Sequence, residues 1–444
     1  MRKKTSLIWL SAAAGLWLGA LTLQDQGLID AYAKPAGIQH GSEGSKGIAL
    51  FRQVLERVRA DYIDKPEDAK LIEAAINGML AKLDPHSDYL DAKSYHDLQT
   101  QTRGEFGGVG IRVSMEDGIV KVVEAIEETP AARAGILADD VITHLDDQAI
   151  KGLGLSEVVD RMRGPVNSDV RLRIVRTGES EPRNLLVKRD NIKVRPVQFR
   201  RIGDDVAYIK LSQFNRPATD GVRTAIKELS RGIGVRGFVL DMRNNPGGLI
   251  DQAVAVAESF IDKGEIVQLR GRYRNEDEVF DAKSGPGDLT KGRPIVVLIN
   301  GGSASSAEIV AGALQDHKRA TIVGTRSYGK GSVQSIIPLG PSNGALRLTT
   351  ARYYTPSGRS IQAQGIKPDI EVMQDVPKAM LASAEMRGEA TLPGHLKGEG
   401  EDRSASQSYV PADQNNDKAL HVALELLRGA YVSATAPSAQ AGTP

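Results

Sequence analysis

Cysteine is absent from the 444 residues, and neither sign of charge is in excess, because 57 Lys and Arg face 56 Asp and Glu. The absence of cysteine excludes disulfides, thiol nucleophiles and thiolate metal sites. A formal charge of +1 gives the chain no overall attraction to nucleic acid, so we expect no nucleic-acid partner. The hydrophobic share of 41% is ordinary for a globular protein. The length is sufficient for roughly two or three cores, and we therefore expect several domains.

The first 33 residues have the features of a targeting segment. Residues 2–4 are basic, an uncharged run spans 5–24, and Ala31 and Ala33 offer small residues for cleavage. This order is typical of a secretory signal peptide, although the apolar run also approaches the length of a membrane anchor. Residues 1–33 are therefore predicted to be a signal peptide or an N-terminal anchor. In both cases we expect the remainder in a bacterial periplasm, soluble or anchored to the inner membrane.

The next two regions differ in hydrophobic periodicity. Between residues 34 and 103, apolar residues recur at helical spacing on both sides of Pro66, which predicts two amphipathic helices. Between residues 104 and 190, short β-patterned runs such as VGIRV and VRLRIV surround one helical pattern at 155–162. This second region is therefore predicted to be a small, separate β-rich domain.

Residues 191–375 alternate between strand and helix patterns. The runs VAYIKL, GFVLDM, PIVVLIN and ATIVG are separated by helical segments at 220–229, 249–261 and 307–314. Such alternation predicts an α/β layer with parallel strands covered by helices. Residues 386–408 hold few apolar side chains amid Gly, Ser and charge, and residues 376–414 are therefore predicted to be a flexible linker. Residues 415–444 are predicted to form a short helix and a disordered end.

A serine-rich segment, NGGSASSAEI at 300–309, joins a buried-type strand to a helix. Its glycines permit a sharp turn, and the start of the helix offers free backbone N–H groups and the positive end of the helix dipole. A serine here can act as a nucleophile whose oxyanion is bound by backbone donors, each contributing about 3 kcal/mol. It can equally be a helix cap, which is the function that this segment taken alone favours.

A second segment, GTRSYGKGSVQ at 324–334, follows the next strand and holds Lys330 between two glycines. In an apolar cleft, loss of water favours the neutral amine, which would make Lys330 a general base. None of the seven histidines lies in a triad-like setting, and GxSxG does not surround the serines at 303–306. A Ser/Lys pair is therefore what remains as nucleophile and base.

The same lysine segment has a competing interpretation. Residues 324–330 fit GxxxxGK, the start of a phosphate-binding loop. However, Gly331 stands where that loop needs Ser or Thr, and β-branched residues and Pro338 follow where it needs a helix. Nucleotide binding is therefore disfavoured.

Six motifs in order along residues 48–372 resemble those of the carboxyl-terminal processing peptidases, which are exported serine peptidases with a Ser/Lys dyad. The motifs are FGGVGI at 106–111, PAARAGI at 130–136, DMRNNPGGL at 241–249, GSASSAEI at 302–309, GTRSYGKGSVQ at 324–334 and YYTPSGRSIQAQGIKPD at 353–369. The resemblance implies that Ser305 is the nucleophile, that Lys330 is the base and that Gln334 helps to orient the lysine. It also implies a crotonase-like α/β protease core, into which the β-rich domain is inserted after the N-terminal helical segment.

The resemblance further implies an oxyanion hole. One donor is the backbone N–H of Ser306, and the other belongs to a glycine of the NNPGG turn, either Gly247 or Gly248. The turn follows the strand GFVLDM, so it can present a backbone donor at the sheet edge where ligands of open α/β sheets bind. Taken alone, the glycines fit an ordinary tight turn equally well.

The β-rich domain resembles a PDZ module, which binds the free C-terminus of a protein. Its predicted peptide-binding residues are Phe106, Gly107, Gly108, Val109, Gly110 and Ile111. The glycines let consecutive backbone N–H groups converge on a carboxylate, and the strand that follows can pair with an incoming peptide. Without the family, the loop fits a plain hairpin equally well. Arg163 follows the helix of this domain and is a candidate regulatory link to the active site, or else a plain exposed arginine.

Together these observations predict an exported endopeptidase that recognises apolar C-terminal tails and cleaves them through an acyl-enzyme, with no metal or cofactor. The predicted partners are protein substrates, other copies of the chain in a homo-oligomer, and an activating envelope lipoprotein. The alternative is a catalytically silent scaffold that only captures protein tails. A trypsin-like protease with PDZ domains is disfavoured because its histidine, aspartate and GxSGG segments are missing.

Overall fold

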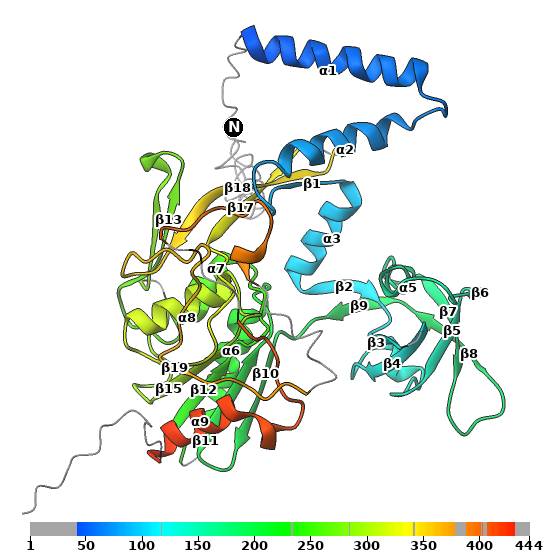
Figure 1. Cartoon of the computed structure of the whole chain (residues 1–444). Coiled ribbons are helices and arrows are strands. Elements are labelled where there is room, and N and C mark those ends of the chain that lie inside the picture. The colour runs from blue at the N-terminus through cyan, green and yellow to red at the C-terminus, as the bar shows by residue number, and fades with distance from the viewer. Residues whose placement is uncertain are drawn as a thin grey trace, which may run out of the picture. The chain divides into compact units, whose positions relative to one another are not determined.

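The fold was analysed in a computed structural model, which describes residues 42–116, 118–231, 234–283, 285–340, 342–377, 388–400, 402 and 406–430. These residues belong to two compact units that divide between Met79 and Leu80. Figure 1 gives the elements in chain order. The predicted signal or anchor at 1–33 and the predicted disordered end after residue 430 lie outside the described residues. Within them, no helix is both long enough and apolar enough to span a bilayer.

The first unit consists of two helices, as the apolar periodicity predicted. Helix α1 spans Ser42–Asp61 and helix α2 spans Asp68–Leu80. Arg59 near the end of α1 bonds to Asp68 at the start of α2, with Nε 2.9 Å from Oδ1. Several apolar side chains of α1 are exposed, among them Ile48 at 68%. Packing within this unit therefore does not bury the apolar face that predicted the helix.

The second unit begins with a short strand and a capped helix. Strand β1 spans Asp88–Leu90 and helix α3 spans Ala92–Arg103. The Asp91 side chain accepts a hydrogen bond from the Ser94 N–H at 2.7 Å, which satisfies a free donor at the helix start. Gly104 ends the helix with φ 75°, a left-handed conformation that glycine adopts without strain. The helix thus stops where the β-rich domain begins.

The β-rich domain is a twisted sheet with two short helices. The sheet has the order β3 (Ile111–Glu116), β4 (Ile119–Ala125), β5 (Val141–Leu145), β7 (Asp169–Val175) and β8 (Arg183–Lys188), with β6 (Gln148–Ala149) paired to β5. The helices are α4 (Pro130–Arg133) and α5 (Leu155–Met162). Strand β7 alternates between exposed and buried residues, as expected for a sheet with one wet face. Strands β2 (Glu105–Gly108) and β9 (Asp190–Lys193) pair with each other where the chain enters and leaves this domain.

A six-stranded sheet forms the centre of the α/β region. Its order is β10 (Val197–Ile202), β11 (Val206–Leu211), β12 (Gly237–Asp241), β15 (Ile295–Ile299), β16 (Thr321–Gly324) and β19 (Ile370–Glu371). All neighbouring pairs from β11 to β19 are parallel, and only β10 at the edge is antiparallel. The predicted parallel α/β layer is therefore confirmed.

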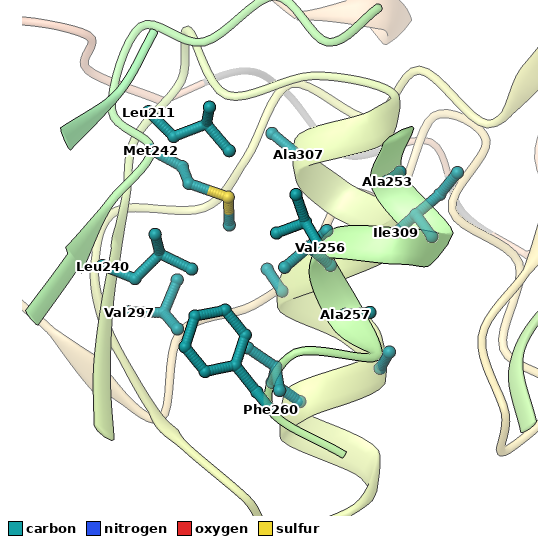
Figure 2. Packing of buried hydrophobic residues seen from close by; sticks show 14 of the residues in the cluster. Leu211, Leu240, Met242, Ala253, Val256, Ala257, Phe260, Val297, Ala307 and Ile309 are labelled. Atoms are coloured by element: carbon teal, nitrogen blue, oxygen red, sulfur yellow. The ribbon is translucent and has the colours of Figure 1, made fainter. Parts of the chain in front are cut away.

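The four central strands β11, β12, β15 and β16 are buried on both faces, which explains why they are almost continuously apolar. Helices α6 (Ala218–Leu229), α7 (Ile250–Ala257) and α8 (Ser306–Asp316) contribute to the core on one face. Figure 2 shows part of this core, where Phe260 and Val256 lie against Leu240 and Val297 of the strands. Successive residues of β12 divide between the two faces, since Phe238 and Leu240 belong to this core and Val239 to the opposite one.

A second, antiparallel sheet was not predicted from the sequence. Its path runs β1, β18 (Ala345–Tyr354), β13 (Glu265–Gly271) and β14 (Glu278–Asp281), and β17 (Ser332–Pro338) also pairs with β18. Strand β17 begins two residues after Lys330, so this sheet supports the lysine segment. The pairing of β1 with β18 places Asp88 opposite Arg347 and draws the turn at 84–91 towards the α/β region.

The flexible linker predicted for residues 376–414 is corrected over the parts that the structure describes. Glu389 and Gln407 are buried within this stretch, the former with no exposed surface. Helix α9 (Lys418–Arg428) then packs on the second face of the central sheet, against β12, β15 and β16 (Figure 1). Asp417 begins this helix and bonds to Arg243, with oxygens 2.7 and 2.8 Å from its two terminal nitrogens. Between residues 388 and 414 the buried side chains that the structure describes are thus polar, whereas α9 packs through apolar side chains.

Candidate active site

Three loops meet at the carboxyl ends of the parallel strands. The NNPGG turn follows β12, the serine segment follows β15 and the lysine segment follows β16. Parallel strands end at the same edge of a sheet, so loops that are far apart in the sequence become neighbours there. Backbone hydrogen bonds join them, since the Ala304 N–H donates to the Asn245 carbonyl at 2.9 Å and the Tyr328 N–H donates to the Ser303 carbonyl at 2.9 Å.

The structure separates the three serines of the GSASS string by what their hydroxyls do. The Ser303 hydroxyl donates to the Met242 carbonyl at 2.8 Å, and the Ser306 hydroxyl donates to the Gly248 carbonyl at 2.9 Å. Both are therefore engaged in holding the NNPGG turn. The Ser305 hydroxyl instead interacts with the phenol of Tyr353. Burial raises the pKa of this phenol to about 12.

Ser305 also has an unusual backbone conformation. Its φ is 53° and its ψ is −115°, outside the regions that ordinary L-residues populate. Such strain costs about 1 to 3 kcal/mol and is found mainly at functional sites. It occurs here because the chain must turn sharply from β15 into α8, which leaves the Ser305 side chain at the turn.

Glu308 links the serine and lysine loops. This residue is fully buried, and its Oε2 accepts hydrogen bonds from the Ser305 N–H at 2.8 Å and from the Lys330 N–H at 2.9 Å. Its Oε1 accepts from the Gly329 N–H at 2.7 Å and from the Ser327 hydroxyl at 2.5 Å. Burial raises the pKa of Glu308 to about 7, although these hydrogen bonds favour the charged form. Because one oxygen binds both backbone groups, Ser305 and Lys330 are neighbours.

Lys330 has a half-buried side chain between these loops. Loss of water lowers the pKa of its amine below the ordinary lysine value, while the nearby carboxylate of Glu389 acts in the opposite direction. Within the described part of the chain, the amine makes no hydrogen bond and no ion pair. An amine in such surroundings can lose its proton more easily than a solvated lysine and accept one from a hydroxyl.

The structure distinguishes the two glycines that the sequence left open. The Gly247 N–H is already used, because it donates to the Asn245 side chain at 2.9 Å. The N–H groups of Gly248 and Ser306 have no hydrogen-bond partner among the described residues. A Cβ on Gly247 would lie 3.0 Å from the Ser306 nitrogen and 2.8 Å from the Ser305 Cβ, so the turn packs directly on the serine. Gly248 and Ser306 are therefore the two free donors beside Ser305.

Gln334 is bonded within the sheet that carries it. Its amide nitrogen donates to the hydroxyls of Ser332 at 2.9 Å and Thr349 at 3.2 Å. Both acceptors lie on the sheet that carries Gln334, and they take up its two N–H groups. A role of Gln334 in orienting Lys330 therefore stays a prediction.

The glycine loop of the β-rich domain has free backbone donors. The N–H groups of Val109 and Gly110 have no partner among the residues described, although both residues are buried. Gly110 has φ 83°, and a Cβ there would lie 2.3 Å from the Thr129 side chain, so only glycine fits. Strand β3 follows the loop and lies at an edge of its sheet. Exposed Arg163 stacks on the Phe106 ring, with its guanidinium carbon 5.0 Å from the ring centre.

Sequence reasoning missed three groups near the lysine. Tyr353 is buried beside Ser305, Glu389 is buried beside the lysine loop, and His86 bonds to Glu389 with Nε2 2.8 Å from Oε2. Tyr353 was available in the YYTPSGRS motif, but Glu389 lies in a stretch with no apolar pattern. No group of three or more potential metal-binding side chains occurs among the residues that the structure describes.

Family models match most of the chain in three successive parts. The model described as peptidase family S41 matches residues 205–372, and a PDZ domain model matches residues 107–187. A third, described as the activating protease CtpB N-terminal domain, matches residues 9–94. The α/β core and the β-rich PDZ domain predicted from the motifs are thus confirmed.

Similar proteins extend along nearly the whole chain. A carboxy-terminal-processing protease of Bartonella bacilliformis is 52% identical over 397 residues, covering 88% of this chain and 91% of that protein. The carboxy-terminal processing protease CtpA of Bacillus subtilis is 31% identical over 373 residues, covering 84% and 78%. A solved structure titled photosystem II D1 C-terminal processing protease is 32% identical, with a TM-score of 0.44 over 74% of this chain and 87% of that one. With half of its residues shared along almost the full length of a relative, the chain belongs to the carboxy-terminal processing proteases and is a serine-type peptidase of family S41.

Proposed function

We propose that this protein is an exported endopeptidase in which Ser305 is the nucleophile and Lys330 the general base. The observation that carries the proposal is the Glu308 carboxylate, whose single Oε2 binds the backbone N–H groups of both residues. Strained backbone at Ser305 and the lowered pKa of Lys330 support the same assignment.

The reaction begins when neutral Lys330 accepts the hydroxyl proton of Ser305. Oγ bonds to the carbonyl carbon of the scissile peptide, and the oxyanion is bound by the N–H groups of Ser306 and Gly248. The C–N bond then breaks, and Lys330 gives its proton to the leaving amine. In the second half a water molecule gives its proton to Lys330 as its oxygen bonds to the same carbon. The ester bond breaks, and the proton returns to the Ser305 oxygen.

The PDZ domain is proposed to bind the C-terminal tail of the substrate. The free N–H groups of Val109 and Gly110 are suited to a terminal carboxylate, and the open edge of β3 is suited to strand addition. Apolar tails are favoured because β3 carries apolar side chains that are only partly buried, namely Ile111, Val113 and Met115. Arg163 covers Phe106 of the same loop and is proposed to sense the bound tail.

Compartment and partners follow from the N-terminal features. We assign the protein to the periplasm, soluble or anchored through residues 1–33, and we expect it to act as a homo-oligomer. The exposed apolar face of α1 supports an intermolecular contact. An envelope lipoprotein that activates the enzyme is the further partner expected.

The test uses the full chain and an unfolded protein substrate with an apolar C-terminus. Ser305→Ala and Lys330→Ala are expected to abolish hydrolysis, and a serine-directed acylating reagent is expected to modify Ser305, as located by mass spectrometry. Converting the substrate's terminal carboxylate to an amide should raise KM. Hydrolysis retained by either variant would show that the dyad is assigned wrongly.

A further inference from the structure

Glu389 is a buried carboxylate that the proposed reaction does not use. It has no exposed surface, and both of its oxygens lie near Nε2 of His86, at 2.8 and 3.0 Å. The Gln362 amide nitrogen donates to its Oε1 at 2.9 Å. A buried carboxylate without partners would cost several kcal/mol, so these two side chains are what permit a charge at this position.

Glu389 is fixed to the loop that carries Lys330. Its N–H donates to the Tyr328 carbonyl at 3.0 Å. Gln362, which holds the carboxylate, also accepts a hydrogen bond from the Gly331 N–H at 3.1 Å. Glu389 is therefore joined to the lysine loop directly before Lys330 and through Gln362 after it.

Four charged groups act on the Lys330 amine. Glu389, Glu308 and Asp84 favour its charged form, Glu389 most strongly, while Arg347 disfavours it. Glu308 is saturated by four hydrogen bonds, as described above. Asp84 accepts from the His86 N–H at 2.8 Å, and Arg347 pairs with Asp88 at 2.6 Å. Two further titratable groups act on Glu389: His86 bonds to it directly, and His395 interacts with its charge without a hydrogen bond among the described residues.

Glu389 acts on the lysine from a distance, because the Lys330 amine forms no ion pair within the described residues. A direct ion pair would keep the amine protonated and unable to accept the serine proton. A carboxylate held back from contact still stabilises the ammonium that forms when the proton is taken up. The hydrogen bonds from His86 and Gln362 hold the Glu389 carboxylate in this position.

We propose that Glu389 is a positioning residue for the Ser305–Lys330 dyad, held off the amine by His86 and Gln362 so that it stabilises the transient ammonium without trapping it. The proposal rests on the proposed function, since it requires Lys330 to be the base. It assigns a catalytic contribution to the segment after residue 387, which the sequence predicted to be a linker.

The test is the pH dependence of kcat/KM for the full chain, measured on an unfolded protein substrate. Glu389→Gln keeps the size of the side chain and removes its charge. The acid limb is expected to move to lower pH by about one unit, and the plateau to fall about tenfold, because the ammonium loses its stabilising charge. Glu399→Gln is the matched control, since Glu399 lies in the same segment, is exposed and bonds only to the Tyr354 hydroxyl among the described residues. Its profile should equal that of the wild type.

A second variant separates this role from a merely structural one. His86→Ala removes the hydrogen bond that holds the carboxylate back, so Glu389 can approach the amine and the acid limb should move to higher pH. Opposite shifts in the two variants would support the proposal, and so would the upward shift alone if Glu389→Gln does not fold. Limbs that stay at the wild-type pH would overturn it. In that event, loss of hydrolysis in Lys330→Ala would still uphold the dyad, whereas hydrolysis retained by Lys330→Ala would overturn the proposed function itself.

Discussion

Gly248→Ala tests the oxyanion donor most directly. Gly248 has φ 145°, a conformation essentially restricted to glycine, and an added Cβ would lie 2.2 Å from the Phe214 carbonyl oxygen. Backbone atoms cannot move out of the way as a flexible side chain can. Phe214 and the turn are joined by two backbone hydrogen bonds, from the Phe214 N–H to Gly247 and from the Leu249 N–H to Phe214. The substitution must therefore displace the turn that carries the Gly248 N–H.

The size of the effect follows from what the donor contributes. Removal of one oxyanion donor lowers kcat about 100-fold to 1,000-fold, equivalent to roughly 3 to 4 kcal/mol. The backbone strain adds about 1 to 3 kcal/mol against folding. We therefore expect Gly248→Ala to lose at least two orders of magnitude in kcat, with KM much less affected, since the oxyanion exists only after attack.

The assay compares kcat at a temperature where each variant is folded, as judged by circular dichroism. Gly118→Ala is the matched control, because Gly118 also has a positive φ, 76°, but an added Cβ meets nothing within 4 Å. It should lose a little stability and no activity. Wild-type kcat in folded Gly248→Ala would refute the assignment of this turn to the oxyanion hole.

Three further predictions concern the charges around the site. Glu308→Gln should lower the kcat of the folded variant about 100-fold, because an amide nitrogen cannot accept hydrogen bonds from the backbone N–H groups that position the nucleophile and the base. A wild-type kcat would contradict this. Asp417→Asn should lower the free energy of unfolding by about 1 to 3 kcal/mol in denaturant titrations, since it removes one of the two buried carboxylates that pair with Arg243 and leaves only Asp241. Asp205→Asn, at the more exposed ion pair at the other end of α9, should change it by less than about 1 kcal/mol. Lys330→Met should raise the melting temperature at neutral pH, because burial lowers the pKa of the folded-state amine and its charged form destabilises the fold. This gain should shrink as pH rises above the folded pKa and vanish above the unfolded value of about 10.4, and a gain that grows with pH would contradict it.

Local sequence patterns were sufficient for the parts of the fold that depend on short-range periodicity. The helix at Leu155–Met162 and the strand at Val206–Leu211 were predicted with the bounds that the structure has. The alternation of strand and helix patterns predicted a parallel sheet, because each helix carries the chain back to the start of the next parallel strand. The glycine-flanked loops at the ends of those strands likewise indicated a serine and Lys330 as candidates, whereas the choice of Ser305 among the serines came from the family resemblance.

Tertiary structure alone decided which polar groups meet around those candidates. The choice between Gly247 and Gly248 depends on a hydrogen bond to Asn245, and no spacing encodes the direction of an N–H group. Glu389 comes from a stretch whose composition predicted disorder, yet it is buried because His86, about 300 residues earlier in the chain, supplies its hydrogen bond. Hydrophobic periodicity indicates which residues are buried together on one face of a helix or strand. It carries no information on which polar side chains from distant parts of the sequence form hydrogen bonds with one another. Such hydrogen bonds, from His86 and Gln362, are what allow the buried Glu389 carboxylate to lie beside the lysine loop.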